Sequence, residues 1–217
     1  MDAQDESVIL LHGLARGPRS MLPLQHALEG QGYRVENVGY ASRHAPVETL
    51  AEQAIAPALD KCSQARRVHF VTHSLGGILV RQYLRQHSVE NLGRVVMLGP
   101  PNRGSEVVDR LGTWPGFHFI NGDAGMQLGV AADSLPNQLG AAAFELGVIA
   151  GNRSINPLLS LVIPGDNDGK VSVSNTRLEG MQDHLVMPVT HPLMMRDKRV
   201  IAQVIHFLKT GAFRHDD

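Results

Sequence analysis

The chain has 217 residues, of which 43% are hydrophobic, so it is long enough to form an ordinary globular domain with a full core and is not disordered. Its formal net charge is −1 and no basic run stands out, which argues against nucleic acid as a partner. A single cysteine, Cys62, excludes an internal disulfide and fits a reducing compartment.

No apolar stretch of the sequence reaches the length of a membrane span. The acidic start over residues 1–6 leads at once into a strand, so no signal peptide is visible and a cytoplasmic location is expected. A chain trimmed of an export signal would look the same.

Strand-like and helix-like segments alternate along the whole chain. Strands are expected at 7–11, 33–38, 68–73, 94–98, 158–163 and 184–189, and helices at 19–30, 47–62, 75–86, 105–111 and 197–208. Pro57 is expected to kink the second of these helices. Such alternation predicts a single α/β domain over 1–217, with a mostly parallel sheet and helices on both of its faces.

One segment, at about 112–157, interrupts this rhythm. It is rich in Gly, Ala and Asn, and its larger apolar residues are Trp114, Phe117, Phe119, Met126, Leu128 and Phe144. It is either an irregular connection that packs its own side chains or a short cap or lid whose apolar face lines an acyl pocket.

The sequence Thr-His-Ser-Leu-Gly-Gly over 72–77 follows the apolar strand and precedes the helix at 75–86. A serine at a tight strand-to-helix turn, flanked by small residues, is typical of a nucleophile elbow. Ser74 would then stand at the carboxyl edge of the sheet, where the N-terminus of the following helix favours developing negative charge. This arrangement predicts a serine that attacks carbonyl carbon.

Such a serine needs a base, which should be a histidine near the end of a late strand. His191 follows the last strand and precedes the last helix, so it is the best-placed candidate. His184 begins that strand at its amino edge. The side chain of His73 should point to the other side of the elbow, and His12 lies too early and is expected to brace a loop.

The acid that orients the base should lie in the loop after the fifth strand. The sequence Gly-Asp-Asn-Asp-Gly over 165–169 offers Asp166 and Asp168 there, and its glycines permit a turn that aims a carboxylate at an imidazole. At least one of the two aspartates must be structural. The segment lacks the ligand spacing of an EF-hand, so no calcium site is expected.

The tetrahedral oxyanion formed during attack requires backbone N–H donors. Leu75 supplies one amide by its position directly after Ser74. The loop after the first strand should supply the second, because Gly13 allows the backbone to turn toward the serine and Leu14 would donate its amide.

Taken together, these motifs resemble the α/β-hydrolase superfamily, and within it the bacterial triacylglycerol lipases and their esterase relatives. His-Ser-Leu-Gly-Gly over 73–77 is similar to the lipase elbow Gly-His-Ser-Leu-Gly, and Leu-His-Gly-Leu over 11–14 is similar to the lipase oxyanion loop. The sequence over 98–106 resembles the lipase loop Gly-Thr-Pro-His-Arg-Gly-Ser. Residues 167–169 match the lipase Asn-Asp-Gly, whose aspartate is the triad acid, so the resemblance favours Asp168 over Asp166.

The resemblance covers nearly the whole chain apart from the cap and implies a minimal α/β-hydrolase fold that begins at the strand these folds number third. Thr72 departs from the lipase pattern because it replaces the first glycine of the elbow, where helix and strand approach closely. The shortness of the cap argues against a large lid and against interfacial activation on oil droplets.

The expected function is that of a serine carboxylic ester hydrolase, lipase or esterase, with Ser74, Asp168 and His191 as the triad and Leu14 and Leu75 as oxyanion donors. No metal or organic cofactor is expected. The substrate would be a small-molecule ester or lipid with an apolar acyl group, with transient contact to a lipid surface.

Two alternatives to an esterase stay open, and the sequence does not indicate an oligomeric state. The same triad would serve an acyltransferase, a thioesterase or an amidase. A catalytically silent binding module is the alternative from another class, but a missing triad member would support it and none is missing.

Overall fold

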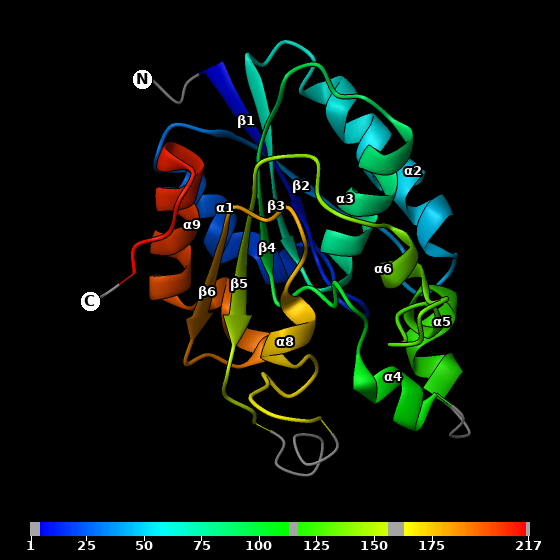
Figure 1. Ribbon diagram of the computed structural model, residues 1–217. Coiled ribbons are helices and arrows are strands. Elements are labelled where there is room, and N and C mark those ends of the chain that lie inside the picture. The colour runs from blue at the N-terminus through cyan, green and yellow to red at the C-terminus, as the bar shows by residue number, and fades with distance from the viewer. Residues whose placement is uncertain (1–4, 113–116, 156–162, 216–217) are drawn as a thin grey trace.

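The computed structural model describes residues 5–112, 117–155 and 163–215, and its centre is a six-stranded sheet in the order β2-β1-β3-β4-β5-β6. Every neighbouring pair of strands is parallel. The strands are β1 (Glu6–Leu11), β2 (Arg34–Val38), β3 (Arg67–His73), β4 (Leu92–Leu98), β5 (Leu146–Gly151) and β6 (Asp183–Met187). The arrowheads of β5 and β6 point to the bottom of Figure 1, so the carboxyl edge of the sheet lies there.

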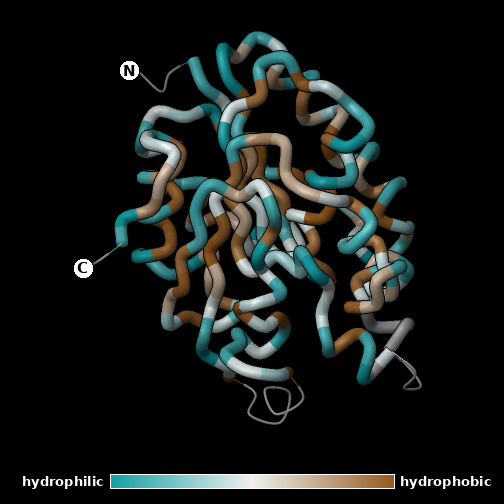
Figure 2. The backbone as a smooth tube through the Cα atoms, viewed as in Figure 1, coloured by the Kyte–Doolittle hydropathy of each residue, from teal (hydrophilic) through white to brown (hydrophobic). Residues whose placement is uncertain are grey.

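Helices cover both faces of the sheet. The longer ones are α1 (Leu22–Glu29), α2 (Val47–Lys61), α3 (Leu75–Gln86) and α9 (Lys198–Thr210). Figure 1 places α1 and α9 on one side of the sheet and α2 and α3 on the other. Two separate clusters of buried side chains fill the two interfaces, and hydrophobic residues are concentrated in the interior of the molecule (Figure 2). This is the α/β architecture that the alternation of the sequence predicts.

The two clusters follow from the alternation of side chains along each buried strand. On β1, Ile9 and Leu11 belong to the cluster under α2 and α3, whereas Val8 and Leu10 belong to the cluster under α1 and α9. The predicted strands at 7–11, 33–38, 68–73, 94–98 and 184–189 are confirmed to within two residues at each end. Pro57 lies within α2, which runs unbroken over Val47–Lys61.

The described residues contain a strand that the sequence did not predict: β5 (Leu146–Gly151) lies within the segment expected to form the cap. Residues 158–163 fall outside the described residues except for residue 163, which lies in a bend. The glycines of β5 gave it the composition of a loop, but close packing requires them. A Cβ on Gly147 would lie 2.5 Å from the Phe207 ring, and one on Gly151 would lie 2.4 Å from the Val189 carbonyl oxygen.

The part of the expected cap that precedes β5 contains short helices: α5 (Phe117–Met126) and α6 (Leu135–Gln138), reached through α4 (Glu106–Leu111). Leu128 and Leu139 are buried in the same cluster as α2 and α3, so this segment packs against the core. The buried Arg81 of α3 donates to the backbone oxygens of Pro136 and Gly140, both at 2.9 Å. Trp114 and the side chains of Phe117 and Phe119 lie outside what the structure describes.

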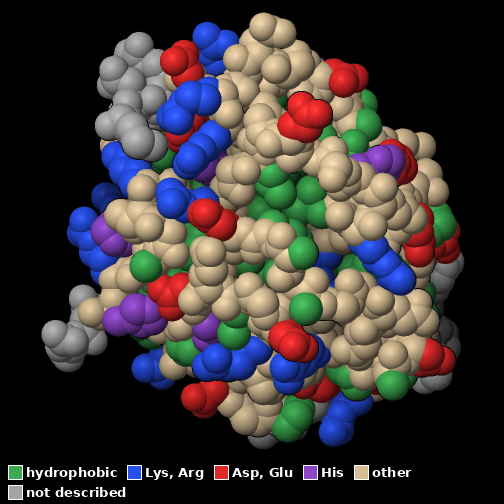
Figure 3. All heavy atoms as spheres, turned by 45° about the horizontal axis from the view of Figure 1, so that its top comes forward, with side chains coloured by type: hydrophobic (Ala, Val, Ile, Leu, Met, Phe, Trp, Pro, Cys, Tyr) green, Lys and Arg blue, Asp and Glu red, His purple; other side chains and the backbone are tan. Residues whose placement is uncertain are grey.

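The remaining short elements are the 3-10 helices η2 (Pro18–Met21) and η3 (His191–Arg196), and the helix α8 (Val173–Thr176). Within the described residues, no helix combines the length and the apolar character needed to cross a membrane. Figure 3 turns the top of Figure 1 toward the viewer and shows Lys and Arg side chains interspersed with Asp and Glu side chains.

Candidate active site

Ser74 stands at the turn between β3 and α3 with φ 53° and ψ −119°. A positive φ is uncommon for a residue with a side chain and is maintained only where the surroundings impose it. Here the Ser74 amide donates to the Leu98 carbonyl of β4 at 2.9 Å, and a Cβ on Gly76 would lie 2.6 Å from the Leu11 carbonyl oxygen. The elbow is therefore fixed between β1 and β4 by contacts that only a glycine at position 76 permits.

Thr72 occupies the elbow position where the lipase pattern has glycine. Its side chain is fully buried, and its hydroxyl oxygen has no hydrogen-bond partner among the described residues. The fold thus accommodates the extra bulk of the threonine at the cost of an unsatisfied hydroxyl.

The side chains of Ser74, His191 and Asp168 form one hydrogen-bonded chain at the carboxyl edge of the sheet. His191 Nδ1 lies 2.7 Å from Asp168 Oδ2, and His191 Nε2 lies 3.0 Å from Ser74 Oγ. The carboxylate accepts the proton of Nδ1, which leaves Nε2 as the acceptor for the serine hydroxyl. Asp168 and His191 are 1% and 3% exposed, whereas Ser74 is partly exposed.

The chain around Asp168 holds its carboxylate in this orientation. Oδ1 accepts hydrogen bonds from the backbone N–H groups of Lys170 and Val171, both at 2.9 Å. The backbone oxygen of Asp168 accepts the His191 amide at 3.0 Å, so the acid and the base are joined through the backbone as well. Asp166 is exposed, and its backbone oxygen accepts the Val173 amide at 2.8 Å. Of the two aspartates, only Asp168 is bonded to the imidazole.

The loop after β1 passes directly over the elbow. A Cβ on Gly13 would lie 2.7 Å from His73 Nδ1 and 3.2 Å from Ser74 Cβ, so the close approach of this loop favours glycine. Ala15 has φ 55°, and its amide donates to Ser42 Oγ at 3.0 Å, which fixes the turn that contains Leu14. In the described part of the chain the Leu14 amide has no intramolecular acceptor. The Leu75 amide lies in the first turn of α3, where helix amides have no partner within the helix.

The three other histidines considered as bases, His12, His73 and His184, make contacts within the fold. His12 stacks on Tyr40 with ring centroids 4.1 Å apart and donates through Nδ1 to the Gly13 oxygen at 2.9 Å, so it braces its loop as expected. His184 bonds to Thr176 Oγ1 at 2.9 Å. His73 was expected to point to the other side of the elbow, and its side chain lies beside the backbone at the start of η3. Its Nε2 donates to the His191 backbone oxygen at 2.9 Å, because the last residue of β3 faces the same side of the sheet as η3.

A family model described as "Alpha/beta hydrolase family" matches residues 8–203, which include the elbow, both aspartates and His191. The chain belongs to the alpha/beta hydrolase family. A search of curated proteins found no match to this hydrolase.

Solved structures that resemble the hydrolase include lipases, an esterase and a phospholipase. The mature lipase BlEst2 of Bacillus licheniformis has a TM-score of 0.71 at 18% identity, over 93% of this chain and 91% of that one. The esterase Pf2001 of Pyrococcus furiosus has a TM-score of 0.65 at 18% identity, over 96% and 83% of the two chains. The phospholipase PlaB of Legionella pneumophila has a TM-score of 0.72 at 17% identity, over 95% of this chain and 60% of that one. At these identities the likeness shows the fold.

Gly99 belongs to the site of the hydrolase, although no individual role was predicted for it. It follows β4 with φ 54°, and a Cβ there would lie 3.0 Å from Asp168 Oδ2 and 3.1 Å from His191 Nδ1. The pattern that could have found it is a glycine directly after the buried strand beside the elbow. For His73, only a role as the base was considered from the sequence. Burial, together with the nearby charge of His191, keeps the pKa of His73 well below its ordinary value.

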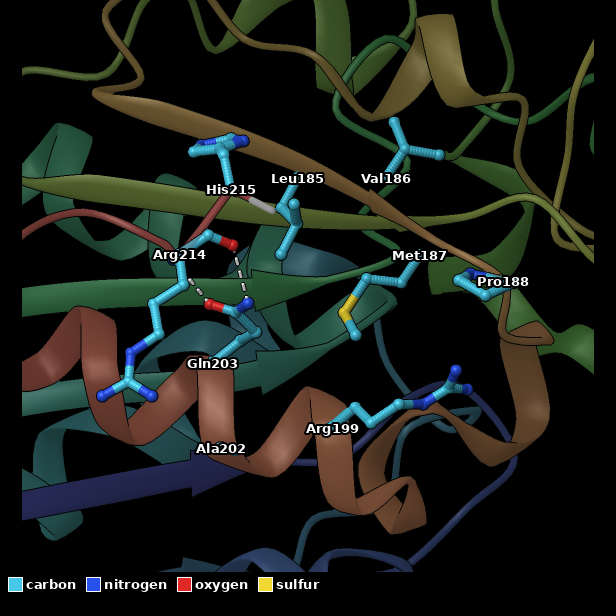
Figure 4. A pocket seen from close by; sticks show the side chains of 9 residues that line it. All are labelled: Leu185, Val186, Met187, Pro188, Arg199, Ala202, Gln203, Arg214 and His215. Carbon is cyan, nitrogen blue, oxygen red and sulfur yellow. Dashed lines mark hydrogen bonds between the residues drawn. The ribbon is translucent and has the colours of Figure 1, made fainter. Parts of the chain in front are cut away.

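Among the described residues no group of three or more His, Cys, Asp or Glu side chains could hold a metal ion. Figure 4 shows a cavity of about 610 Å³ between β6 and α9, lined by Leu185, Val186, Met187, Pro188, Arg199, Ala202, Gln203, Arg214 and His215. None of the triad residues contributes to its lining, so this cavity is separate from the candidate active site.

Proposed function

We propose that this hydrolase cleaves carboxylic esters through a covalent acyl-serine intermediate, as a lipase or an esterase. The observation that carries the proposal is the continuous hydrogen-bonded chain from Asp168 through His191 to Ser74, with contacts of 2.7 Å and 3.0 Å. A serine hydroxyl becomes nucleophilic when a base takes its proton and a third group orients that base.

In the proposed reaction, Ser74 Oγ attacks the ester carbonyl carbon while His191 Nε2 takes the hydroxyl proton. The oxyanion of the tetrahedral intermediate accepts hydrogen bonds from the backbone N–H groups of Leu14 and Leu75. The intermediate collapses when His191 returns its proton to the leaving alkoxide, which departs as the alcohol. Water activated by His191 then attacks the acyl-serine ester and releases the carboxylic acid.

The role proposed for Asp168 follows from its contacts. Its Oδ2 holds Nδ1 of His191 in the protonated form, and the negative charge stabilises the imidazolium that forms when Ser74 loses its proton. Two backbone amides hold Oδ1, so the carboxylate cannot rotate away from the imidazole. Both side chains are buried, which strengthens their electrostatic interaction.

The lipase, phospholipase and esterase among the structural relatives favour ester substrates of lipid type. Together with the apolar residues of the segment before β5, they support an apolar acyl group and transient contact with a lipid surface. A cytoplasmic location remains part of the proposal.

Ser74→Ala tests the proposal, with hydrolysis of 4-nitrophenyl butyrate and labelling by a fluorophosphonate probe as the two measurements. We expect kcat/KM to fall by several powers of ten, to about 10⁻⁴ or less of the wild-type value, and labelling to disappear. Ser63→Ala, at an exposed serine after α2, is the matched control and should retain both. Turnover or labelling of Ser74→Ala at the wild-type level would refute the assignment.

A further inference from the structure

Each of the three loops that form the candidate active site carries a basic side chain that the proposed reaction does not use. Arg16 follows the Gly13–Leu14 turn, Lys170 follows the acid, and Arg196 is the last residue of η3, which begins at His191. Arg16 is partly exposed, and Lys170 and Arg196 are exposed.

The backbone of each loop is fixed close to the reacting groups. The Lys170 amide donates to Asp168 Oδ1 at 2.9 Å, and its carbonyl oxygen accepts the Ser105 hydroxyl at 2.8 Å. The Arg16 amide donates to the Gly13 oxygen at 3.3 Å, and η2, which begins two residues later, packs against η3. The three loops that carry these cations are thereby held beside the reacting groups.

None of these three cations has a carboxylate partner within ion-pair distance among the described residues. Some other basic side chains do: Lys61 pairs with Glu36, Arg94 with Glu145 at 2.6 Å, and Arg199 with Asp197 at 2.9 Å. The negative charge of Asp168 acts on Lys170, but this carboxylate is already hydrogen-bonded to His191.

Arg16 is close enough to both of the other cations for their charges to interact with it. Burial and the charge of Arg196 lower the pKa of Arg16. Lys170 is accessible to solvent, yet the protein around its amino group desolvates it, and this effect together with the charge of Arg16 lowers its pKa. Like charges gathered in this way disfavour the empty site and favour an anion that neutralises them.

The proposed mechanism says which part of a substrate would carry that anion. His191 Nε2 must give its proton to the leaving alkoxide, so the alcohol part of the ester lies beside the loops of His191 and Asp168. Two of the cations, Lys170 and Arg196, belong to these two loops. The acyl group is expected to be apolar and to lie elsewhere.

We propose that Arg16, Lys170 and Arg196 form an anion-binding subsite for a phosphate or carboxylate carried by the alcohol part of the ester substrate. The subsite rests on the proposed esterase function and narrows its substrate class to esters of anionic alcohols. Arginine and lysine both bind such groups through charge-assisted hydrogen bonds, and arginine can do so bidentately.

The test compares four esters in the wild-type protein and in variants. 4-Butyryloxybenzoate and 4-butyryloxyphenyl phosphate carry the anion on the alcohol part, methyl 4-butyryloxybenzoate is the neutral counterpart, and the mono-4-nitrophenyl ester of succinate carries the anion on the acyl part. Arg16→Gln and Lys170→Gln remove the charge, and the second keeps the amide that binds Asp168 Oδ1. Lys198→Gln, at an exposed cation in the first turn of α9, is the matched control.

For Arg16→Gln and Lys170→Gln, we expect kcat/KM on at least one ester of an anionic alcohol to fall about tenfold more than on the methyl ester, chiefly through KM. Which of the two esters responds distinguishes a phosphate subsite from a carboxylate subsite. In Lys198→Gln, the ratio of kcat/KM on the anionic esters to kcat/KM on the neutral methyl ester should not change. An equal effect on all four esters, or the larger effect on the succinate ester, would overturn the subsite.

Failure of the subsite and failure of the esterase function give different results. If the subsite proposal is wrong, Ser74-dependent hydrolysis of the neutral methyl ester persists. The ratio of kcat/KM between anionic and neutral esters is then unchanged in Arg16→Gln and Lys170→Gln. If the esterase function is wrong, the wild-type protein hydrolyses neither the neutral nor the anionic esters.

Discussion

Two buried histidine–carboxylate pairs lie at opposite edges of the same sheet. At the amino edge, His69 Nε2 lies 3.1 Å from Glu6 Oε2, and at the carboxyl edge, His191 Nδ1 lies 2.7 Å from Asp168 Oδ2. Both histidines are at most 3% exposed. By the chemistry of the pair alone, either one could be taken for a base and its orienting acid.

The second ring nitrogen separates the two pairs. His69 Nδ1 accepts the backbone N–H of Arg94 at 2.8 Å, and a Cβ on Gly93 would lie 2.6 Å from the same ring. His191 Nε2 faces the hydroxyl of Ser74, which is partly open to solvent. The pair at the amino edge is therefore closed on both nitrogens by the fold, whereas the pair at the carboxyl edge leaves one nitrogen for a reacting group.

The largest contrast should appear when each histidine is removed in turn. His191→Ala should lower kcat/KM on 4-nitrophenyl butyrate by about 10⁴-fold, because it removes the proposed base. His69→Ala should leave kcat within about threefold but lower the free energy of unfolding by about 2–4 kcal/mol, because it leaves a cavity and two unpaired polar groups. Steady-state kinetics and urea unfolding on both variants measure the contrast. A large loss of kcat in folded His69→Ala would remove the distinction between the two pairs.

The glycine beside each pair provides a second, smaller contrast. In Gly99→Ala the added methyl group meets Asp168 Oδ2 and His191 Nδ1 at a position with φ 54°, so kcat should fall about 10- to 100-fold. In Gly93→Ala the methyl group meets the His69 ring, so the expected effect is a loss of about 1–3 kcal/mol of stability with kcat retained. The melting temperature and kcat are measured on each variant. Equal loss of kcat in both would show that the two positions affect the site alike.

The smallest expected effect is a pH dependence of stability. Burial, the largest influence, lowers the pKa of His69 below its ordinary value of 6.5 in the folded chain. The unfolded chain then binds more protons, so this contribution to stability is fully present above about pH 6.5 and is lost as the pH falls toward the folded-state pKa. His69→Gln should flatten the fall of the unfolding free energy between pH 7.5 and 5, by up to about 1.4 kcal/mol per pH unit below 6.5. Urea unfolding at several pH values measures it, and an unchanged slope would contradict it.

The pattern of apolar residues was sufficient to predict most of the fold. Five of the six strands and the longer helices lie where their periodicity places them, because each buries one face or both against a neighbour. The exception is β5, where Gly147 and Gly151 make a central strand look like part of a loop. The need for glycine there comes from the Phe207 ring and from the Val189 backbone, which are distant along the chain.

For the candidate site, chain order and the parallel sheet were enough to bring Ser74, His191 and the loop of Asp168 to one edge. The sequence left two aspartates in that loop until the resemblance favoured Asp168, and in the structure it is the carboxylate bonded to His191. The contact between the His73 ring and the His191 backbone was not expected, because it depends on which loop returns to cover the end of β3.

The sequence by itself thus determined the alternation of strands and helices and the residue types that meet at the carboxyl edge, since both depend on local spacing and on the direction of parallel strands. Only the tertiary structure decided which buried histidine keeps a ring nitrogen open toward a hydroxyl, and which loops pack beside it. These depend on contacts between segments more than a hundred residues apart, such as the one between Ser74 and His191, and no local pattern records them.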